Sequence, residues 1–158
     1  MKRIMPKRTN LKSSIELKVN RNHNYTISIT DKNGKSLNFR DISGEDLEFL
    51  EKTLTRDEAA QKNFLTFENI ISLLNLLNVE KIDLGNCSKR VCLAIFKKVD
   101  EQILCNYMPK YEWLEYCYAL QNGSFANLAA MEKVPLTKFI AMIQIHKKAI
   151  DSISNNSE

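Results

Sequence analysis

The spacing of apolar residues changes once along this chain, near residue 42, and this change limits the folds that the chain can adopt. Between residues 15 and 39, apolar side chains alternate with polar ones in three short runs. The runs are Ile15, Leu17 and Val19, then Tyr25, Ile27 and Ile29, then Leu37 and Phe39. Alternation places the apolar side chains of a run on one face, as in a half-buried β-strand. The sequence therefore predicts three strands.

Two stretches between these runs are typical of turns. The pair Asn33-Gly34 separates the second and third runs, and it is the preferred pair for a tight primed hairpin turn. An Asn-rich stretch at residues 20–24 connects the first and second runs. We therefore expect an antiparallel β-meander. Its apolar face cannot stay in contact with water, so the rest of the chain must supply helices that cover it.

From Ser43 onward, apolar residues recur every three or four positions, which is typical of amphipathic helices. Ser43 and Thr66 are suited to cap helix N-termini, and Thr55 followed by Glu58 has the spacing of a capping box. The most regular amphipathic segment covers residues 88–104. These signals predict several helices joined by short connections.

Proline and glycine divide the second half of this helical region. Pro109 is suited to the first position of a helix, and Gly123 to a left-handed helix stop. Ser124 can then cap a short helix, and a final helix is expected from about Pro135 to about Ile153. The predicted fold class is α+β and mostly α, with a small N-terminal antiparallel β-meander followed by a bundle of about five or six helices.

The positive charge of the chain is concentrated at its N-terminus. Of the 23 basic residues, five lie in the first twelve positions, where no acidic residue occurs, and the other 18 are balanced by 19 acidic residues. We expect a flexible arm, because disorder concentrates at chain ends; a tether to an acidic partner or to nucleic acid is the alternative. The nearly neutral remainder lacks the field that nucleic-acid binding uses. The expected organisation is a basic arm at residues 1–12, the β-meander at 13–41, a helical body at 42–153 and a polar tail at 154–158.

Several classes of protein are disfavoured by motifs that the sequence does not contain. No stretch approaches the roughly 20 apolar residues of a membrane helix, and the N-terminus lacks the apolar segment of a secretory signal. Without an export signal the four cysteines are expected to be reduced, and because they form no CxxC pair no zinc site is expected. No phosphate-binding glycine loop, nucleophile elbow or HExxH motif occurs. We expect a soluble cytoplasmic protein that uses no metal or cofactor and is not an enzyme.

Residues 124–148 have the spacing of a helix-turn-helix motif. Leu128, Val134 and Phe139 occur at positions where that motif packs its two helices together. The polar side chains that could reach DNA from the second helix are Thr137, Lys138, Gln144 and Lys148. Apolar residues occupy most of the other positions near the start of this helix, where base contacts would be needed. A DNA-binding regulator is therefore the alternative interpretation.

Apolar side chains surround more than half of the final helix. One stripe runs through Leu136, Phe139 and Ile143, and a second runs through Met142 and Ile145. Such a helix either lies at the centre of a core or divides its surface between the core and a partner protein. The sequence favours packing against protein over contact with phosphates.

Aromatic residues likewise surround the helix that begins near Pro109. Trp113 and Tyr116 fall on one side of it, whereas Tyr111 and Tyr118 fall on the other. Tyr and Trp are enriched at protein interfaces, although core packing remains the alternative for this cluster. The residues predicted to bind a partner protein are Trp113, Tyr116, Phe125, Met131, Phe139, Met142 and Ile145.

Three segments, FRDISGEDLEFLEKTL, FLTFENIISLLNLLNV and LQNGSFANLAAMEKVPLTKFIAMIQIHKK, follow a short strand region. In this order they resemble the baseplate-hub and tail-assembly proteins of contractile-tailed bacteriophages of the T-even type, over residues 36–150. The resemblance implies a non-enzymatic hub component or assembly chaperone that engages other tail proteins through its C-terminal helices. Some relatives carry a cysteine-rich zinc ribbon, but this chain has no CxxC pair, so no metal or catalytic residue is carried over.

The predicted function is therefore protein–protein interaction. We expect a baseplate-hub or tail-assembly protein that binds other tail components, located in the host cytoplasm or in the virion. The alternative is a helix-turn-helix regulator that uses residues 124–148 together with the basic arm.

Overall fold

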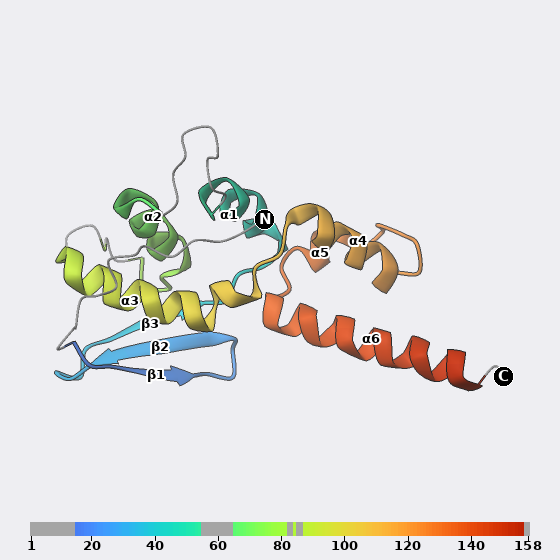
Figure 1. Ribbon diagram of the computed structural model, residues 1–158, viewed down its shortest axis with the longest axis horizontal. Helices are drawn as coiled ribbons and strands as arrows, with labels where there is room; N and C mark the ends of the chain where they lie inside the picture. The colour runs from blue at the N-terminus through green and yellow to red at the C-terminus, as the bar shows by residue number, and fades with distance from the viewer. Residues whose placement is uncertain (1–14, 55–64, 82–83, 85–86, 157–158) are drawn as a thin grey trace.

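The computed structural model describes residues 15–54, 65–81, 84 and 87–156 (Figure 1). The strands β1 (Leu17–Arg21), β2 (Thr26–Asp31) and β3 (Ser36–Arg40) form one antiparallel sheet in the order β1-β2-β3. The helices are η2 (Gly44–Asp46), α1 (Leu47–Leu54), α2 (Phe67–Leu77), α3 (Lys89–Gln102), η4 (Leu104–Asn106), α4 (Lys110–Leu120), α5 (Leu128–Met131) and α6 (Leu136–Asn156). The predicted α+β architecture is confirmed. The basic arm and the Thr55–Glu58 capping box lie outside the described residues.

Helices cover one face of the sheet, with α3 packed against β1 and β2, α2 packed against β3 and α3, and α1 packed against α2 (Figure 1). The sheet contributes Ile27, Ile29 and Phe39 to the core, and all three side chains are buried. The helices contribute mainly Leu and Ile from positions three or four apart, as their amphipathic patterns predict. The N-terminal sheet and α1 to α3 therefore share one core.

Both hairpins of the sheet use three-residue loops, so the predicted primed turn at Asn33-Gly34 is wrong. Gly34 has φ +82°, but Asn33 is not among the described residues with positive φ. The amide of Asp31 donates to the carbonyl of Lys35 at 2.9 Å, and Asp31 Oδ1 accepts from the amides of Asn33 and Lys35. The Asp31 carboxylate thus stabilises a longer loop with one left-handed residue at its end.

The loop between β1 and β2 has Tyr25 at the left-handed position that Gly34 occupies in the loop between β2 and β3. The amide of Asn22 donates to the carbonyl of Thr26 at 2.9 Å, and Tyr25 takes the left-handed conformation with φ +57°. A side chain with a Cβ in this conformation costs roughly 1–2 kcal/mol. We therefore expect Tyr25→Gly to raise the free energy of unfolding by about 1 kcal/mol in urea titrations. A decrease would mean that the side chain of Tyr25 packs more favourably than its backbone is strained.

The helix boundaries follow the capping residues at most ends. Ser43 forms a capping box with Asp46, and Thr66 accepts a hydrogen bond from the amide of Asn69. Gly123 stops α4 in the left-handed conformation, and its amide donates to the carbonyl of Tyr118 at 2.8 Å. These predictions are confirmed.

Two predicted boundaries at the C-terminal end are wrong. Ser124 does not cap the next helix; its Oγ accepts from the amide of Ala126 in a local turn, and α5 begins only at Leu128. The final helix, α6, continues to Asn156, so part of the expected polar tail is helical.

Helices α4, α5 and α6 form the C-terminal part of the molecule (Figure 1). The rings of Trp113 and Phe139 stack with centroids 5.6 Å apart, and both side chains are completely buried. Lys110 lies over the Trp113 ring, with Nζ 4.3 Å from the centroid, and it also donates to the carbonyl of Gly44. The first half of α6 is thereby fixed to α4 and to the segment after β3, while its second half extends away from the body.

All four cysteines carry free thiols, and Cys92 and Cys117 are buried. Burial raises the pKa of each of these two thiols to about 11, so they are poor nucleophiles near neutral pH. In the part of the chain that the structure describes, no helix combines the length and the apolar content needed to cross a membrane.

Candidate functional site

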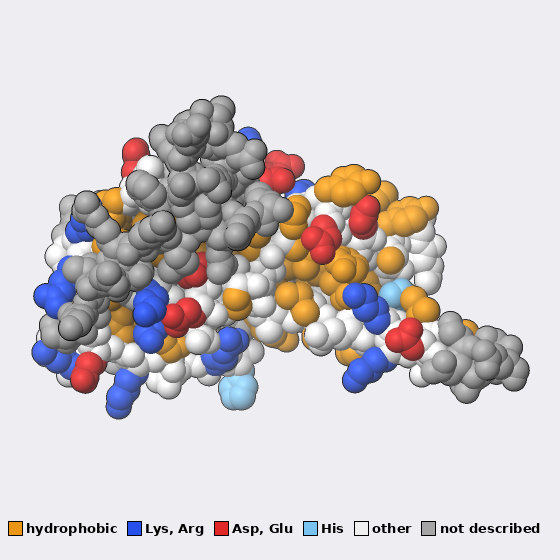
Figure 2. Space-filling view, viewed as in Figure 1, with side chains coloured by type: hydrophobic (Ala, Val, Ile, Leu, Met, Phe, Trp, Pro, Cys, Tyr) orange, Lys and Arg blue, Asp and Glu red, His pale blue; other side chains and the backbone are white. Residues whose placement is uncertain are grey.

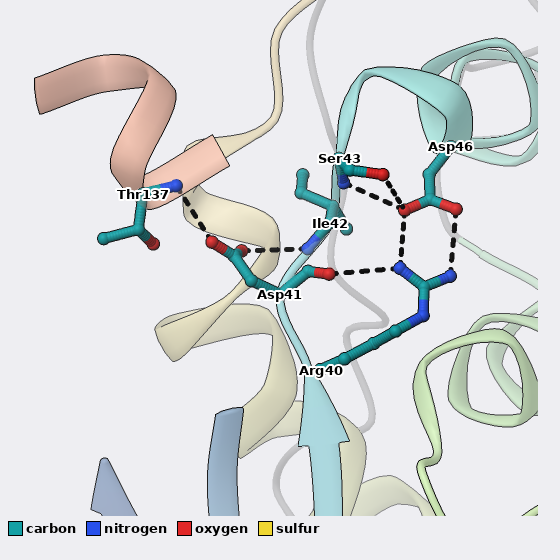
Figure 3. Close-up of polar contacts among 6 residues, drawn as sticks. All are labelled: Arg40, Asp41, Ile42, Ser43, Asp46 and Thr137. Atoms are coloured by element: carbon teal, nitrogen blue, oxygen red, sulfur yellow. Dashed lines mark hydrogen bonds and ion pairs between the residues drawn. The ribbon is translucent and has the colours of Figure 1, made fainter. Parts of the chain in front are cut away.

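The segment between β3 and α1 is bonded to the start of α6 (Figure 3). Asp41 is buried, and its two carboxylate oxygens accept from the amides of Ile42 at 2.9 Å and Thr137 at 2.8 Å. The second of these bonds satisfies one of the free amides at the N-terminus of α6. The carboxylate therefore connects the end of the sheet to the final helix across 96 positions of sequence.

A second carboxylate in the same segment is held by an arginine. Arg40 donates to both oxygens of Asp46 at 2.7 and 2.9 Å, and Asp46 also accepts from the amide and hydroxyl of Ser43 (Figure 3). The hydrogen bond and the charge of Asp46 raise the pKa of Arg40 in spite of burial, so the guanidinium stays charged. This network fixes the start of η2 and serves the fold.

The pH dependence of stability provides a test of the Asp41 contact. Burial raises the pKa of the Asp41 carboxyl, because its charged form is poorly solvated, although the bonds from Thr137 and Ile42 oppose the shift. A carboxyl with a raised folded-state pKa stabilises the fold most below its unfolded pKa, and this contribution is lost as pH rises through the folded pKa. We therefore expect the unfolding free energy of the wild type, minus that of Asp41→Asn, to fall as the pH rises above the ordinary carboxyl pKa of about 4. A difference that rises with pH would contradict this assignment.

The predicted helix-turn-helix is also bonded to this segment. The amide of Leu136 donates to the carbonyl of Ile42 at 2.8 Å, and the amide of Glu45 donates to the carbonyl of Glu132 at 3.1 Å. Lys133, at a turn position where glycine is common, is not among the described residues with positive φ. The turn between α5 and α6 thus belongs to the internal packing of the protein.

Three of the residues predicted to bind a partner are core residues instead. Trp113 and Phe139 are 0% exposed and Met131 is 9% exposed. All three belong to the hydrophobic core, where Trp113 stacks on Phe139 and packs against the buried Gly44. The prediction that these three side chains form a binding surface is wrong, because the isolated chain already buries them.

The other four predicted residues lie partly or mainly at the surface. Phe125 is 49% exposed and Ile145 is 68% exposed. Tyr116 and Met142 are half-buried and pack against the core, and Lys147 Nζ lies 5.5 Å from the centroid of the Tyr116 ring. Phe125 and Ile145 are therefore the members of the predicted set that a partner can reach most freely.

Four further apolar residues are exposed on the same helices. They are Tyr111, Tyr118, Ile150 and Ile153, with exposed fractions of 74%, 49%, 47% and 69%. Together with Phe125 and Ile145 they make up what we call the C-terminal apolar surface. Figure 2 shows hydrophobic side chains gathered over the α4–α5 region on one face of the molecule. The sequence placed Tyr111 and Tyr118 on the side of their helix opposite Trp113, and this signal could have identified them.

The four residues predicted to contact DNA are not all exposed on one basic surface of α6. Thr137 is half-buried, and its hydroxyl accepts from Asn106 Nδ2 at 3.1 Å. Lys138, Gln144 and Lys148 are exposed. The first helix of the motif is only the four-residue α5, which is shorter than a helix that could brace a recognition helix across the DNA backbone.

A small cavity of about 190 Å³ opens beside Asp41. It is lined by Arg21, Asn22, Tyr25, Thr26, Ile27, Asp41, Gln102, Ile103 and Thr137. Arg21 donates to Gln102 Oε1 at 2.8 Å, and the Asp41 carboxylate accepts the two amides described above. The charged groups here connect the sheet, α3 and α6, which favours a structural role. Among the described residues, no group of three or more His, Cys, Asp or Glu side chains is arranged to hold a metal ion.

Comparison with known proteins gives no match: no family model fits the sequence, and no curated protein or solved structure is detectably similar to it.

Proposed function

We propose that the protein is a non-enzymatic interaction module that binds another protein through the C-terminal apolar surface. The observation that supports this most strongly is the distribution of exposed apolar side chains. Among the described residues, nine large hydrophobic side chains are exposed, and six of them lie between residues 111 and 153. A concentration of exposed large apolar side chains in one part of a domain is typical of a binding site for protein.

The setting that we propose is the assembly of a contractile phage tail, with a hub or other tail component as the partner. This part of the proposal rests on the resemblance of residues 36–150 to baseplate-hub and tail-assembly proteins. DNA binding is less well supported, because α6 presents Ile145, Ile150 and Ile153 to solvent along the part of the helix that leaves the body. Exposed isoleucines gain nothing from a groove lined with phosphates.

The proposal can be tested by affinity purification of the tagged protein from infected host cells. We expect tail proteins to copurify with the wild type and to be lost with the triple variant Ile145→Ser, Ile150→Ser, Ile153→Ser. Serine has a helix propensity close to that of isoleucine, so the exposed helix should persist. Val79→Ser is the matched control, since Val79 is 48% exposed outside the C-terminal helices. Recovery of the same proteins with wild type and triple variant would contradict the proposal.

A gel-shift titration at low salt tests the DNA-binding alternative. A DNA-binding protein should shift duplex DNA with an affinity that falls steeply as salt rises. We expect no shift, and a shift that is lost in Lys138→Glu, Lys148→Glu would favour the alternative.

A further inference from the structure

The second half of α6 is largely uncovered by the other elements that the structure describes. In Figure 1, α6 passes beneath α4 and α5 and then extends beyond them. From Gln144 to Ile153 every side chain is exposed except that of His146, which is half-buried. The whole helix has 21 residues and is therefore about 31 Å long. The uncovered half offers several turns along which another element could lie.

The residues on this uncovered half are poorly suited to a helix that stays in water. Ile145, Ile150 and Ile153 are 68%, 47% and 69% exposed. Isoleucine is a weaker helix former than Ala, Leu, Lys or Glu, and an uncovered helix end depends on propensity alone. Packing against a partner would explain why isoleucine occupies these positions.

Four apolar side chains form one sector of the helix. Met142, Ile145, Ala149 and Ile153 follow spacings of three and four, and Ile150 lies beyond His146 on the side that faces α4 nearer the body. An amphipathic helix that docks on another helix uses anchors at such spacings. The sector therefore fits an elongated helical partner better than a compact, globular one.

Lysines border this sector on both sides. Lys148 lies three positions from Ile145 along one edge, and Lys147 lies three positions from Ile150 along the other. Lys147 is close enough to the Tyr116 ring to remain beside α4, whereas Lys148 is exposed. In all of α6, three lysines are opposed by one acid, Asp151. A helix lying on the sector would place its own flanking side chains next to these lysines.

We propose that the uncovered half of α6 binds an amphipathic helix whose apolar stripe is flanked by acidic residues. The inference rests on the proposed function and specifies the chemistry of the partner. Apolar contact with Ile145, Ala149 and Ile153 supplies the affinity, and opposite charges at the two edges select the acidic partner over a basic one.

Two synthetic peptides provide the test. Both are fluorescently labelled 18-residue helices with the same leucine stripe, and one carries Glu and the other Lys at all flanking positions. We expect fluorescence anisotropy with the full-length protein to give at least about tenfold tighter binding of the Glu peptide at low salt, with a smaller ratio as salt rises. Lys147→Glu, Lys148→Glu should reverse the preference. Ile145→Ser, Ile153→Ser should weaken binding of both peptides while circular dichroism shows unchanged helix content.

Other outcomes would overturn the inference in distinguishable ways. If both peptides bind equally and binding depends on Ile145 and Ile153, the preference for an acidic partner is contradicted. The proposed interaction surface would still stand. Failure of both peptides would remove the helical partner, and the affinity purification above would then decide the proposed function. Sedimentation velocity tests whether the partner is a second copy of this chain. Its α4 carries the exposed residues Glu112 and Glu115, which could lie beside the lysines of α6. Self-association that Ile145→Ser abolishes would assign the sector to a dimer instead.

Discussion

Gly44→Ala is expected to destabilise the protein by about 3 kcal/mol or more, because the added methyl group would overlap the ring of Trp113. A Cβ at Gly44 would lie 2.6 Å from Trp113 Cε2 and 2.9 Å from Cη2. The indole cannot move aside easily, since it is completely buried and stacks on Phe139. Urea unfolding followed by tryptophan fluorescence, which reports on the only tryptophan of the chain, would measure the loss.

Gly34→Ala is the matched control for this substitution. A Cβ at Gly34 meets nothing within 4 Å, but the backbone has φ +82°. Its cost should therefore be limited to conformational strain of about 1 kcal/mol. If Gly44→Ala cost no more than Gly34→Ala, the close contact between the η2 segment and α4 would be wrong.

Phe139→Ala is expected to cost about 3–5 kcal/mol, the range for removing a fully buried aromatic ring. Phe139 is 0% exposed and stacks on Trp113, so the substitution leaves a cavity between α4 and α6. Because this contact fixes the first half of α6, we also expect the variant to lose cooperativity in thermal unfolding monitored by circular dichroism.

The contrasting substitution on the same helix is Ile145→Ala. Ile145 is 68% exposed, and alanine is the better helix former, so stability should change by less than about 0.5 kcal/mol. If Ile145→Ala lowered the free energy of unfolding strongly and Phe139→Ala lowered it little, Ile145 would face the core of the protein and Phe139 would face solvent. That result would invalidate the C-terminal apolar surface.

The sequence predicted the elements of this fold because their signals are local. Alternation in residues 15–39 and the three- or four-residue spacing after Ser43 depend on which face of a strand or helix is apolar. Caps at Ser43 and Thr66 and the stop at Gly123 depend on a few neighbouring atoms. The loop at Gly34 shows the limit, since the bonds from Asp31 select a longer turn than the Asn-Gly pair predicts.

The candidate surface was harder to predict because burial is decided by distant contacts. Trp113 and Tyr111 belong to the same helix, yet one is completely buried and the other is 74% exposed. Which side of α4 faces inward depends on Gly44, which leaves room for the indole, and on the bond from Asp41 to Thr137, which places α6. Local spacing does not show either contact, so the sequence assigned three core residues to the surface.

Hydrogen–deuterium exchange of α6, measured in the isolated protein and in the complex recovered by affinity purification, tests the interaction surface most directly. We predict that amides from Gln144 to Ile153 exchange rapidly in the isolated protein and become protected in the complex, while those near Phe139 are protected in both. Strong protection of residues 144–153 in the isolated protein, or rapid exchange of the same residues in the complex, would contradict the account.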